Sequence, residues 1–179
     1  MAERRLAKLF APRSIAVAGA SARDGSIGKA VLKNIREAGF RGQLTGVNPR
    51  HAEVDGLPCV PRFADLPATP DLAVICAPKE NVAALVEDAA AKGVPFAVVI
   101  TADHHHGPGS LDEKLREIAR RTGIRVVGPN CIGVIAPRGK LNASFSASFP
   151  TPGDLAVISQ SGAVAAAIID WARGHKIGL

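Results

Sequence analysis

The sequence has very few aromatic residues, with no tyrosine, one tryptophan and six phenylalanines among 179 residues. Proteins that bind nucleic acid commonly combine basic side chains with aromatic rings on which bases stack, so this scarcity argues against nucleic acid as a partner. The 22 lysines and arginines outnumber the 16 acidic residues, but they are dispersed along the chain. A dispersed net charge of +6 instead favours a small polyphosphate ligand.

Cysteine is also scarce, because Cys59, Cys76 and Cys131 are the only three. Their odd number and wide spacing exclude a zinc-finger pattern and fit a reducing compartment. The most apolar stretch, residues 162–169, is too short to cross a bilayer, and the first residues lack the apolar segment of a secretory signal. We therefore expect a cytoplasmic protein with no membrane partner.

Apolar strands alternate with amphipathic helices along most of the chain. Apolar residues make up 47% of the sequence, enough for a substantial core. This alternation predicts an α/β fold, a Rossmann-like parallel sheet with helices on both faces. The expected strands are residues 14–18, 43–47, 71–76, 94–100 and 124–127, and the expected helices are residues 4–10, 27–37, 81–92 and 111–121.

The character of the sequence changes after Cys131, where prolines and glycines become frequent. A strand is expected over residues 154–159, followed by a turn and a helix over residues 163–172. One such unit cannot close a core of its own. We therefore expect one domain over residues 1–149 and the beginning of a second, truncated domain over residues 150–179.

Three glycines, Gly19, Gly25 and Gly28, lie between the first strand and the first helix. A glycine turn at the start of a helix lets the backbone approach an anion, and this arrangement is typical of a phosphate site. The dinucleotide fingerprint also requires an acidic residue after the second strand, but Asn48-Pro49-Arg50-His51 stands there. The cation favours a ligand that carries an extra phosphate on its nucleotide.

Several motifs along nearly the whole chain resemble one family. They are Gly19-Ala20-Ser21, Val47-Asn48-Pro49, Gly128-Pro129-Asn130-Cys131-Ile132-Gly133, Leu141-Asn142-Ala143-Ser144-Phe145 and Ser159-Gln160-Ser161-Gly162. The chain resembles the NDP-forming acyl-CoA synthetases, relatives of the succinyl-CoA synthetase α subunit. The same module begins the bacterial protein lysine acetyltransferases of the Pat type.

The resemblance implies a CoA-binding Rossmann-like domain followed by the start of a flavodoxin-like, succinyl-CoA synthetase-like domain. It implies coenzyme A or acetyl-CoA as cofactor and a small-molecule acyl-CoA as partner, together with further C-terminal domains of the same chain. It leaves a homo-oligomer open. The fragment is expected to bind rather than to catalyse alone, so no catalytic residue is assigned within it.

Each implied site residue lies at a strand end or a helix start, where backbone N–H groups are free. The first turn would hold CoA phosphates, the second strand end would meet the adenosine 3′-phosphate region, and the later strand ends would line the path to the thiol. The implied CoA-binding residues are Gly19, Ser21, Gly25, Ser26, Ile27, Gly28, Lys29, Asn48, Pro49, Arg50, Cys76, Ala77, Pro78, Thr101, Ala102, Asn130 and Cys131. The implied phosphate-binding residues are Ser159, Gln160, Ser161 and Gly162.

Residues 101–109 differ from the Ile-Thr-Ala-Gly-Phe-x-Glu pattern of many ligases, because both the Gly-Phe pair and the Glu are missing. The missing carboxylate argues against ligase chemistry, and the continuation Gly107-Pro108-Gly109-Ser110-Leu111 resembles the Pat-type proteins. Together they favour a protein lysine acetyltransferase with an acyl-CoA synthetase-like regulatory region. The alternatives are an ADP-forming acyl-CoA synthetase acting through acyl phosphate and phosphohistidine, an NADP-dependent oxidoreductase module with Arg50 on the 2′-phosphate, and a redox-sensing CoA-binding regulator. Residues 104–106, three consecutive histidines, are interpreted as a solvated loop at the mouth of the site, so no metal is expected.

Overall fold

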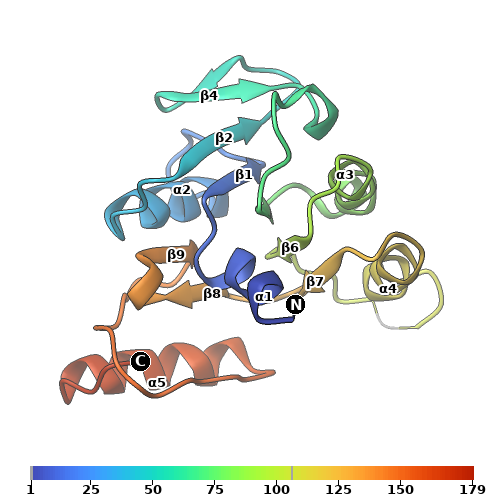
Figure 1. The fold of residues 1–179 in the computed structure, drawn as a ribbon. Helices are drawn as coiled ribbons and strands as arrows, with labels where there is room; N and C mark the ends of the chain where they lie inside the picture. Colours follow the sequence, from blue (N-terminus) through green and yellow to red (C-terminus); the bar gives the residue numbers. More distant parts are fainter. Residues whose placement is uncertain (1, 106) are drawn as a thin grey trace.

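The computed structural model describes residues 2–105 and 107–179, and its centre is a seven-stranded sheet (Figure 1). The strand order is β3-β4-β2-β1-β5-β6-β7, and every pair of neighbours is parallel except β3 and β4. The strands are β1 (Ser14–Ala18), β2 (Gln43–Val47), β3 (Glu53–Val54), β4 (Leu57–Val60), β5 (Leu72–Ile75), β6 (Phe96–Val99) and β7 (Arg125–Val127). The predicted Rossmann-like α/β fold is confirmed.

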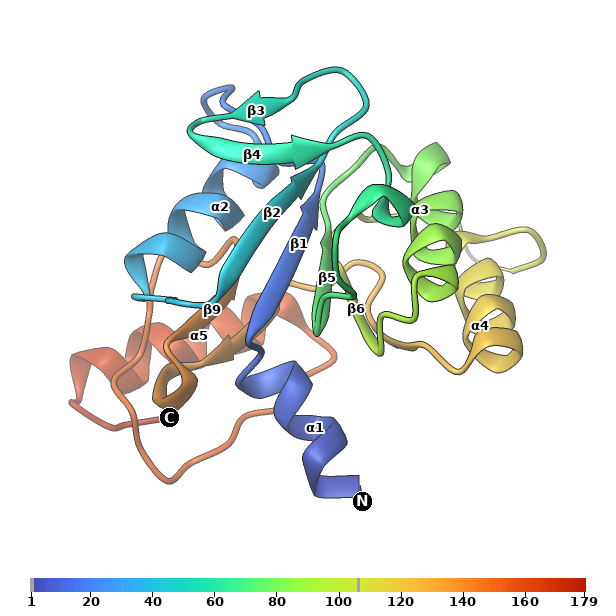
Figure 2. The same cartoon turned by 45° about the horizontal axis from the view of Figure 1, so that its top comes forward.

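Helices cover both faces of this sheet, with α2 on one side and α3 and α4 on the other (Figure 2). The helices are α1 (Ala2–Phe10), α2 (Ile27–Glu37), α3 (Lys79–Ala91), α4 (Leu111–Thr122) and α5 (Gly162–Gly174), and short 3₁₀ turns occupy η1 (Phe63–Asp65) and η2 (Pro137–Gly139). None of the helices within the described ranges combines the length and the apolarity of a bilayer span.

Side chains of β1 alternate between two buried clusters, one on each face of the sheet. Ile15 and Val17 pack with Leu32 and other residues of α2, whereas Ala16 and Ala18 pack with Val82 and other residues of α3 and α4. Because a parallel sheet is buried on both faces, its central strands β5 and β6 are apolar at every position.

A separate antiparallel hairpin, β8 (Gly133–Ala136) and β9 (Leu141–Ser144), packs beside α2. The sequence analysis expected only an irregular segment here. All four residues of β9 are buried, including the polar Asn142 and Ser144. The Ser144 hydroxyl donates a hydrogen bond of 2.5 Å to the Asn142 side-chain oxygen, so this pair satisfies itself inside the protein.

The strand expected over residues 154–159 is wrong, because this segment pairs with no other strand in the described structure. Its apolar side chains are exposed, with Leu155 at 58% and Ile158 at 99%. A strand needs a neighbour to satisfy its backbone groups, and none lies alongside. The helix that follows is present as α5, beside the hairpin (Figure 1). The domain boundary near residue 150 stays a prediction.

Candidate functional site

The carboxyl ends of the parallel strands bring the predicted residues to one edge of the sheet. Ala18 of β1 is in register with Val47 of β2 and Ile75 of β5, and Ile75 is in register with Val99 of β6. The segments 19–21, 48–50, 76–78, 101–102 and 128–131 therefore leave the sheet side by side. Ligands of open α/β sheets bind at this edge.

The first turn is packed so closely that two of its glycines have no space for a side chain. A Cβ on Gly28 would lie 2.0 Å from the Gly19 carbonyl oxygen. A Cβ on Gly19, which has a φ of +86°, would lie 2.7 Å from the Cys76 carbonyl. The start of α2 is therefore seated directly on the end of β1, and β1 in turn is pressed against the end of β5.

The start of α2 presents unpaired backbone donors at this edge. Ser26 caps the helix, since its Oγ accepts a hydrogen bond of 3.3 Å from the Lys29 N–H and donates one of 2.7 Å to the Arg23 carbonyl. In the described part of the chain, the N–H groups of Ile27 and Gly28 have no acceptor. These donors and the positive end of the helix dipole form an anion-binding arrangement.

Two cations lie near this arrangement, and they differ in their partners. The Lys29 ammonium lies 2.5 Å from Asp24, and this hydrogen bond raises the pKa of Lys29 and lowers that of Asp24. The Arg50 side chain is exposed and forms no ion pair with any described residue. Asn48 shapes the strand end, because its Oδ1 accepts the N–H groups of Arg50 (2.9 Å) and His51 (3.3 Å).

Hydrogen bonds join the three strand ends on the other side of the edge. The Thr101 hydroxyl donates to the Ala77 carbonyl at 2.7 Å, and the Asn130 N–H donates to the Thr101 carbonyl at 3.0 Å. Gly128, with a φ of +98°, approaches so closely that a Cβ there would lie 2.2 Å from the Val99 carbonyl oxygen. The structure thus brings the predicted residues Ala77, Thr101 and Asn130 together.

The two cysteines at this edge are not poised to react. Burial raises the pKa of Cys76 to about 12 and also raises the pKa of Cys131. The Cys131 thiol donates to the Val99 carbonyl at 3.3 Å, and both side chains pack against the core on the α2 face. A protonated thiol is a poor nucleophile, so the two thiols are not activated for covalent chemistry.

Asp103 organises the loop that departs from the ligase pattern, a role that the sequence analysis missed. Its Oδ1 accepts the His105 N–H (3.1 Å) and the Lys79 ammonium (3.2 Å), and its Oδ2 accepts the Leu111 N–H (3.0 Å). The backbone hydrogen bond from Leu111 contributes most to lowering the pKa of Asp103. Because both oxygens are used, this carboxylate anchors the loop to α3 and α4.

The histidine loop itself is exposed at His104 and His105, while His106 lies outside the described residues. A ring nitrogen of His105 lies 3.1 Å from the Pro108 carbonyl. No group of three or more potential metal ligands gathers within residues 2–105 and 107–179.

The predicted phosphate turn before α5 lies beside Ile132, the residue that directly precedes β8. The Ser161 hydroxyl caps α5 by accepting the Val164 N–H at 3.3 Å. The Ser159 hydroxyl accepts the Ser161 N–H and donates to the Ser161 carbonyl, each at 3.0 Å. A Cβ on Gly162 would lie 2.7 Å from the side chain of Ile132, the residue after Cys131. The turn is therefore a second capped helix start next to the first edge.

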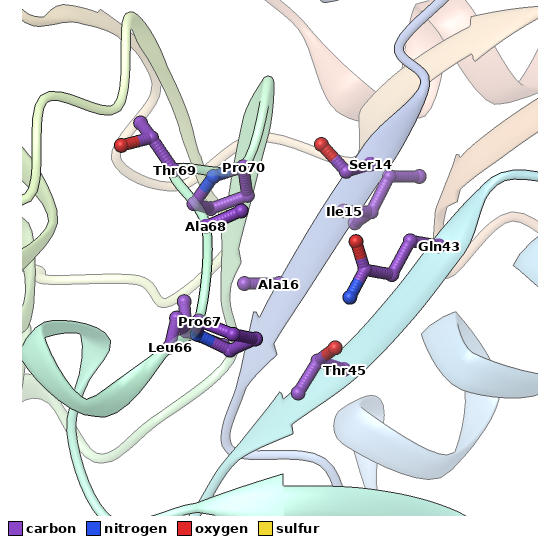
Figure 3. Close-up of a pocket in the computed structure, with 10 residues that line it drawn as sticks. All are labelled: Ser14, Ile15, Ala16, Gln43, Thr45, Leu66, Pro67, Ala68, Thr69 and Pro70. Atoms are coloured by element: carbon purple, nitrogen blue, oxygen red, sulfur yellow. The ribbon is translucent and has the colours of Figure 1, made fainter.

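A pocket at the opposite edge of the sheet is too small for a cofactor. Figure 3 shows that Ser14 and Gln43, at the starts of β1 and β2, line it together with residues 66–70. Its volume of about 10 Å³ holds no more than a single water molecule. Ligands of open α/β sheets bind at the carboxyl edge, which is therefore the better candidate for the functional site.

A glycine turn, a capped helix start and a cation at the carboxyl edge of a parallel sheet define a Rossmann-like domain that binds a phosphate-bearing cofactor. The family model described as a CoA binding domain matches residues 13–137. The chain therefore belongs to the CoA-binding domain family. The expected cofactor, coenzyme A, is confirmed at the level of this family.

The chain is similar to the N-terminal region of ADP-forming acetate–CoA ligases. It is 41% identical over 168 residues to the enzyme of Methanocaldococcus jannaschii, covering 93% of this chain and 24% of that protein. It is 38% identical over 185 residues to the subunit alpha of ligase I of Pyrococcus furiosus, and the match covers 97% of this chain and 39% of that subunit. The chain thus spans well under half the length of these relatives.

A solved structure with the same fold is the dinucleotide-forming acetyl-coenzyme A synthetase 1 of Candidatus Korarchaeum cryptofilum, in complex with phosphate and ADP. The TM-score is 0.89 at 40% identity, and the match covers 97% of this chain and 38% of the other. The suspected relationship to the NDP-forming acyl-CoA synthetases is therefore confirmed.

Proposed function

We propose that this chain is the CoA-binding region of an ADP-forming acyl-CoA synthetase that works through acyl phosphate and phosphohistidine. The two relatives named above are ADP-forming acetate–CoA ligases and the solved structure is an acetyl-coenzyme A synthetase, and these names support the synthetase alternative. They lend no support to the protein lysine acetyltransferase that the departure at residues 101–109 favoured.

The observation that carries the proposal is the seating of α2 on the end of β1. It directs the free N–H groups of Ile27 and Gly28 outward at the edge where a CoA pyrophosphate is bound. Arg50 then meets the 3′-phosphate of the adenosine. The ends of β5, β6 and β7, held together through Thr101, line the path of the pantetheine towards the thiol.

The capped turn before α5 serves the other half of the proposed reaction. Residues 159–162 hold a phosphate at the start of a helix of 13 residues, and this turn belongs to the second domain that we infer from residue 150 onward. We assign the histidine that receives the phosphate to the further domains, so this chain is expected to bind CoA without catalysing the reaction alone. The whole enzyme requires its further domains.

Calorimetric titration with CoA tests the proposal, with Arg50→Glu as the informative variant. The unaltered chain is expected to bind CoA with micromolar affinity. Charge reversal replaces an attraction to phosphate by a repulsion, each on the order of 1 kcal/mol in water-exposed surroundings, so affinity should fall about 10- to 30-fold.

Arg41→Glu is the matched control, because Arg41 is equally exposed but precedes β2 at the opposite edge of the sheet. Strand β2, which lies between the two arginines, spans about 13 Å at about 3.3 Å per residue, beyond the screening length of about 8 Å. Equal losses in both variants would contradict the assigned site. Binding of NADP⁺ without binding of CoA would favour the oxidoreductase alternative and refute the proposal.

A further inference from the structure

The proposed function uses two helix starts, and the contacts between their helices are few. One is the start of α2, capped by Ser26, and the other is the start of α5, capped by Ser161. Helix α5 buries only Ile169 and Ala172 of its 13 residues. We therefore expect a few specific contacts, rather than a broad packed interface, to fix the position of α5 relative to α2.

Asn34, in the third turn of α2, makes the first of these contacts. Its side-chain amide donates to the carbonyl of Ser144 and to the carbonyl of Ser146, each at 2.8 Å. An amide nitrogen carries two hydrogens, so both are used on the segment that follows β9. Asn34 lies about 12 Å along the helix from the cap at Ser26.

Residues 144–148, which we call the serine strap, continue the hydrogen bonds from there. The Ser144 hydroxyl accepts the Ser146 N–H at 3.1 Å. The Ser146 hydroxyl accepts the Ser148 N–H at 3.2 Å and donates to the Ser148 carbonyl at 3.0 Å. The hydroxyl of Ser148, a buried residue, donates to the carboxylate of Asp170 on α5. An unbroken series of hydrogen bonds thus joins the two helices.

We propose that Asn34 is a positioning residue that acts through the serine strap to place α5, and with it the turn at residues 159–162, relative to the CoA phosphate site. The inference rests on the proposed function, since it concerns the same two sites. A helix is a stiff element, so a ligand that fixes the first turn of α2 also fixes Asn34 and the strap carbonyls that it holds. CoA binding at α2 therefore restricts α5, which CoA does not touch.

Hydrogen exchange of the α5 amides, measured on the whole chain with and without CoA, tests this coupling. In the unaltered chain CoA should slow exchange in α5 by about fivefold, the low end of typical couplings between sites. Asn34→Asp has the same size but loses both donors, and Ser148→Ala removes the bond to Asp170. Both variants should still bind CoA while the slowing in α5 disappears.

The double variant with both changes should lose no more of the CoA-dependent slowing in α5 than either single variant, because the two residues act in one series. Lys33→Ala is the control, since Lys33 is the neighbouring residue of α2 and makes only a surface pair with Glu37. It should keep the full CoA-dependent slowing. Ser148→Ala carries the same test if Asn34→Asp does not fold.

A purely structural role for Asn34 would speed exchange in α5 equally with and without CoA, leaving the ratio unchanged, and that result would overturn the inference. So would an unaltered chain that binds CoA without any slowing in α5. An unaltered chain that binds no CoA would overturn the proposed function and this inference together, so the two failures are distinguishable.

Discussion

Replacing Gly28 by alanine tests the seating of α2 on the end of β1, on which the CoA site depends. The new Cβ would lie 2.0 Å from the Gly19 carbonyl oxygen, whereas real Cβ contacts essentially never fall below 3.0 Å. The neighbour is backbone and cannot rotate away. The start of α2 must therefore withdraw by about 1 Å, taking the N–H groups of Ile27 and residue 28 with it.

Two opposing effects set the size of the change in stability. Overpacking against a fixed neighbour costs about 1–3 kcal/mol, and a contact this short belongs at the upper end. Alanine inside a helix is better than glycine by about 1 kcal/mol. A net loss of about 2 kcal/mol follows, which for a chain of this size lowers the melting temperature by about 4–8 °C.

Urea unfolding followed by circular dichroism measures this loss, and calorimetry measures the accompanying loss of CoA affinity. Gly174→Ala is the matched control, because Gly174 is also helical but has no atom within 4 Å of its would-be Cβ. It should be neutral or stabilising by up to about 1 kcal/mol. If Gly28→Ala were as stable as the unaltered chain and bound CoA equally well, the reasoning would be refuted.

Two further predictions follow from the titrating groups of the edge. The folded state holds the pKa of Asp103 below its ordinary value of about 4, so the carboxylate stabilises the fold at higher pH and this contribution is lost as the pH falls below about 4. Asp103→Asn should therefore have a lower free energy of unfolding at pH 7 than the unaltered chain. In urea titrations its free energy of unfolding should fall less steeply between pH 5 and 3, and equal slopes for the two chains would contradict the assignment. Cys76, with a pKa of about 12, should react with iodoacetamide at pH 8 on the order of 100-fold more slowly in the folded chain than in urea. Peptide mass spectrometry measures both rates, and similar rates would restore the redox-sensing alternative.

The sheet was predictable because its signals are local. Strands β5 and β6 each consist of four consecutive apolar residues, which indicates burial on both faces of the sheet. Ser26 and Ser110 cap the helices α2 and α4, and serine is a common residue at this position. The glycine turn was predictable for the same reason, since close approach of backbone to backbone requires glycine wherever it occurs.

The contacts that complete the site were not predictable, because they join residues far apart in the sequence. Lys79 and Asp103 are 24 residues apart, and Asn34 is 110 residues from Ser144. The hairpin strand β9 was hidden for a related reason. Its polar residues Asn142 and Ser144 are typical of exposed positions in a sequence, but both are buried and their side chains hydrogen-bond to each other.

The acetyltransferase hypothesis rests on residues 101–109, where the Gly-Phe pair and the glutamate of many ligases are missing, and the relatives do not support it. The structure places Asp103 in that loop, but both of its carboxylate oxygens already accept hydrogen bonds from backbone N–H groups or from Lys79. Asp103 therefore supplies no free carboxylate to the site. The similarity to the ligases, in contrast, extends over more than nine-tenths of the chain. A loop can change while the scaffold that binds CoA does not, since loops tolerate substitution better than the elements they connect.

Residues 154–159 show how a correct local signal leads to an incorrect element. The run Leu155-Ala156-Val157-Ile158 has the composition of a buried strand, and the turn and helix after it formed as expected. Strand propensity, however, measures how well side chains fit a half-buried pleated surface, and no other strand of the described residues supplies such a surface here. Ile158, exposed at 99%, therefore belongs to an apolar run that has no strand beside it within the described residues.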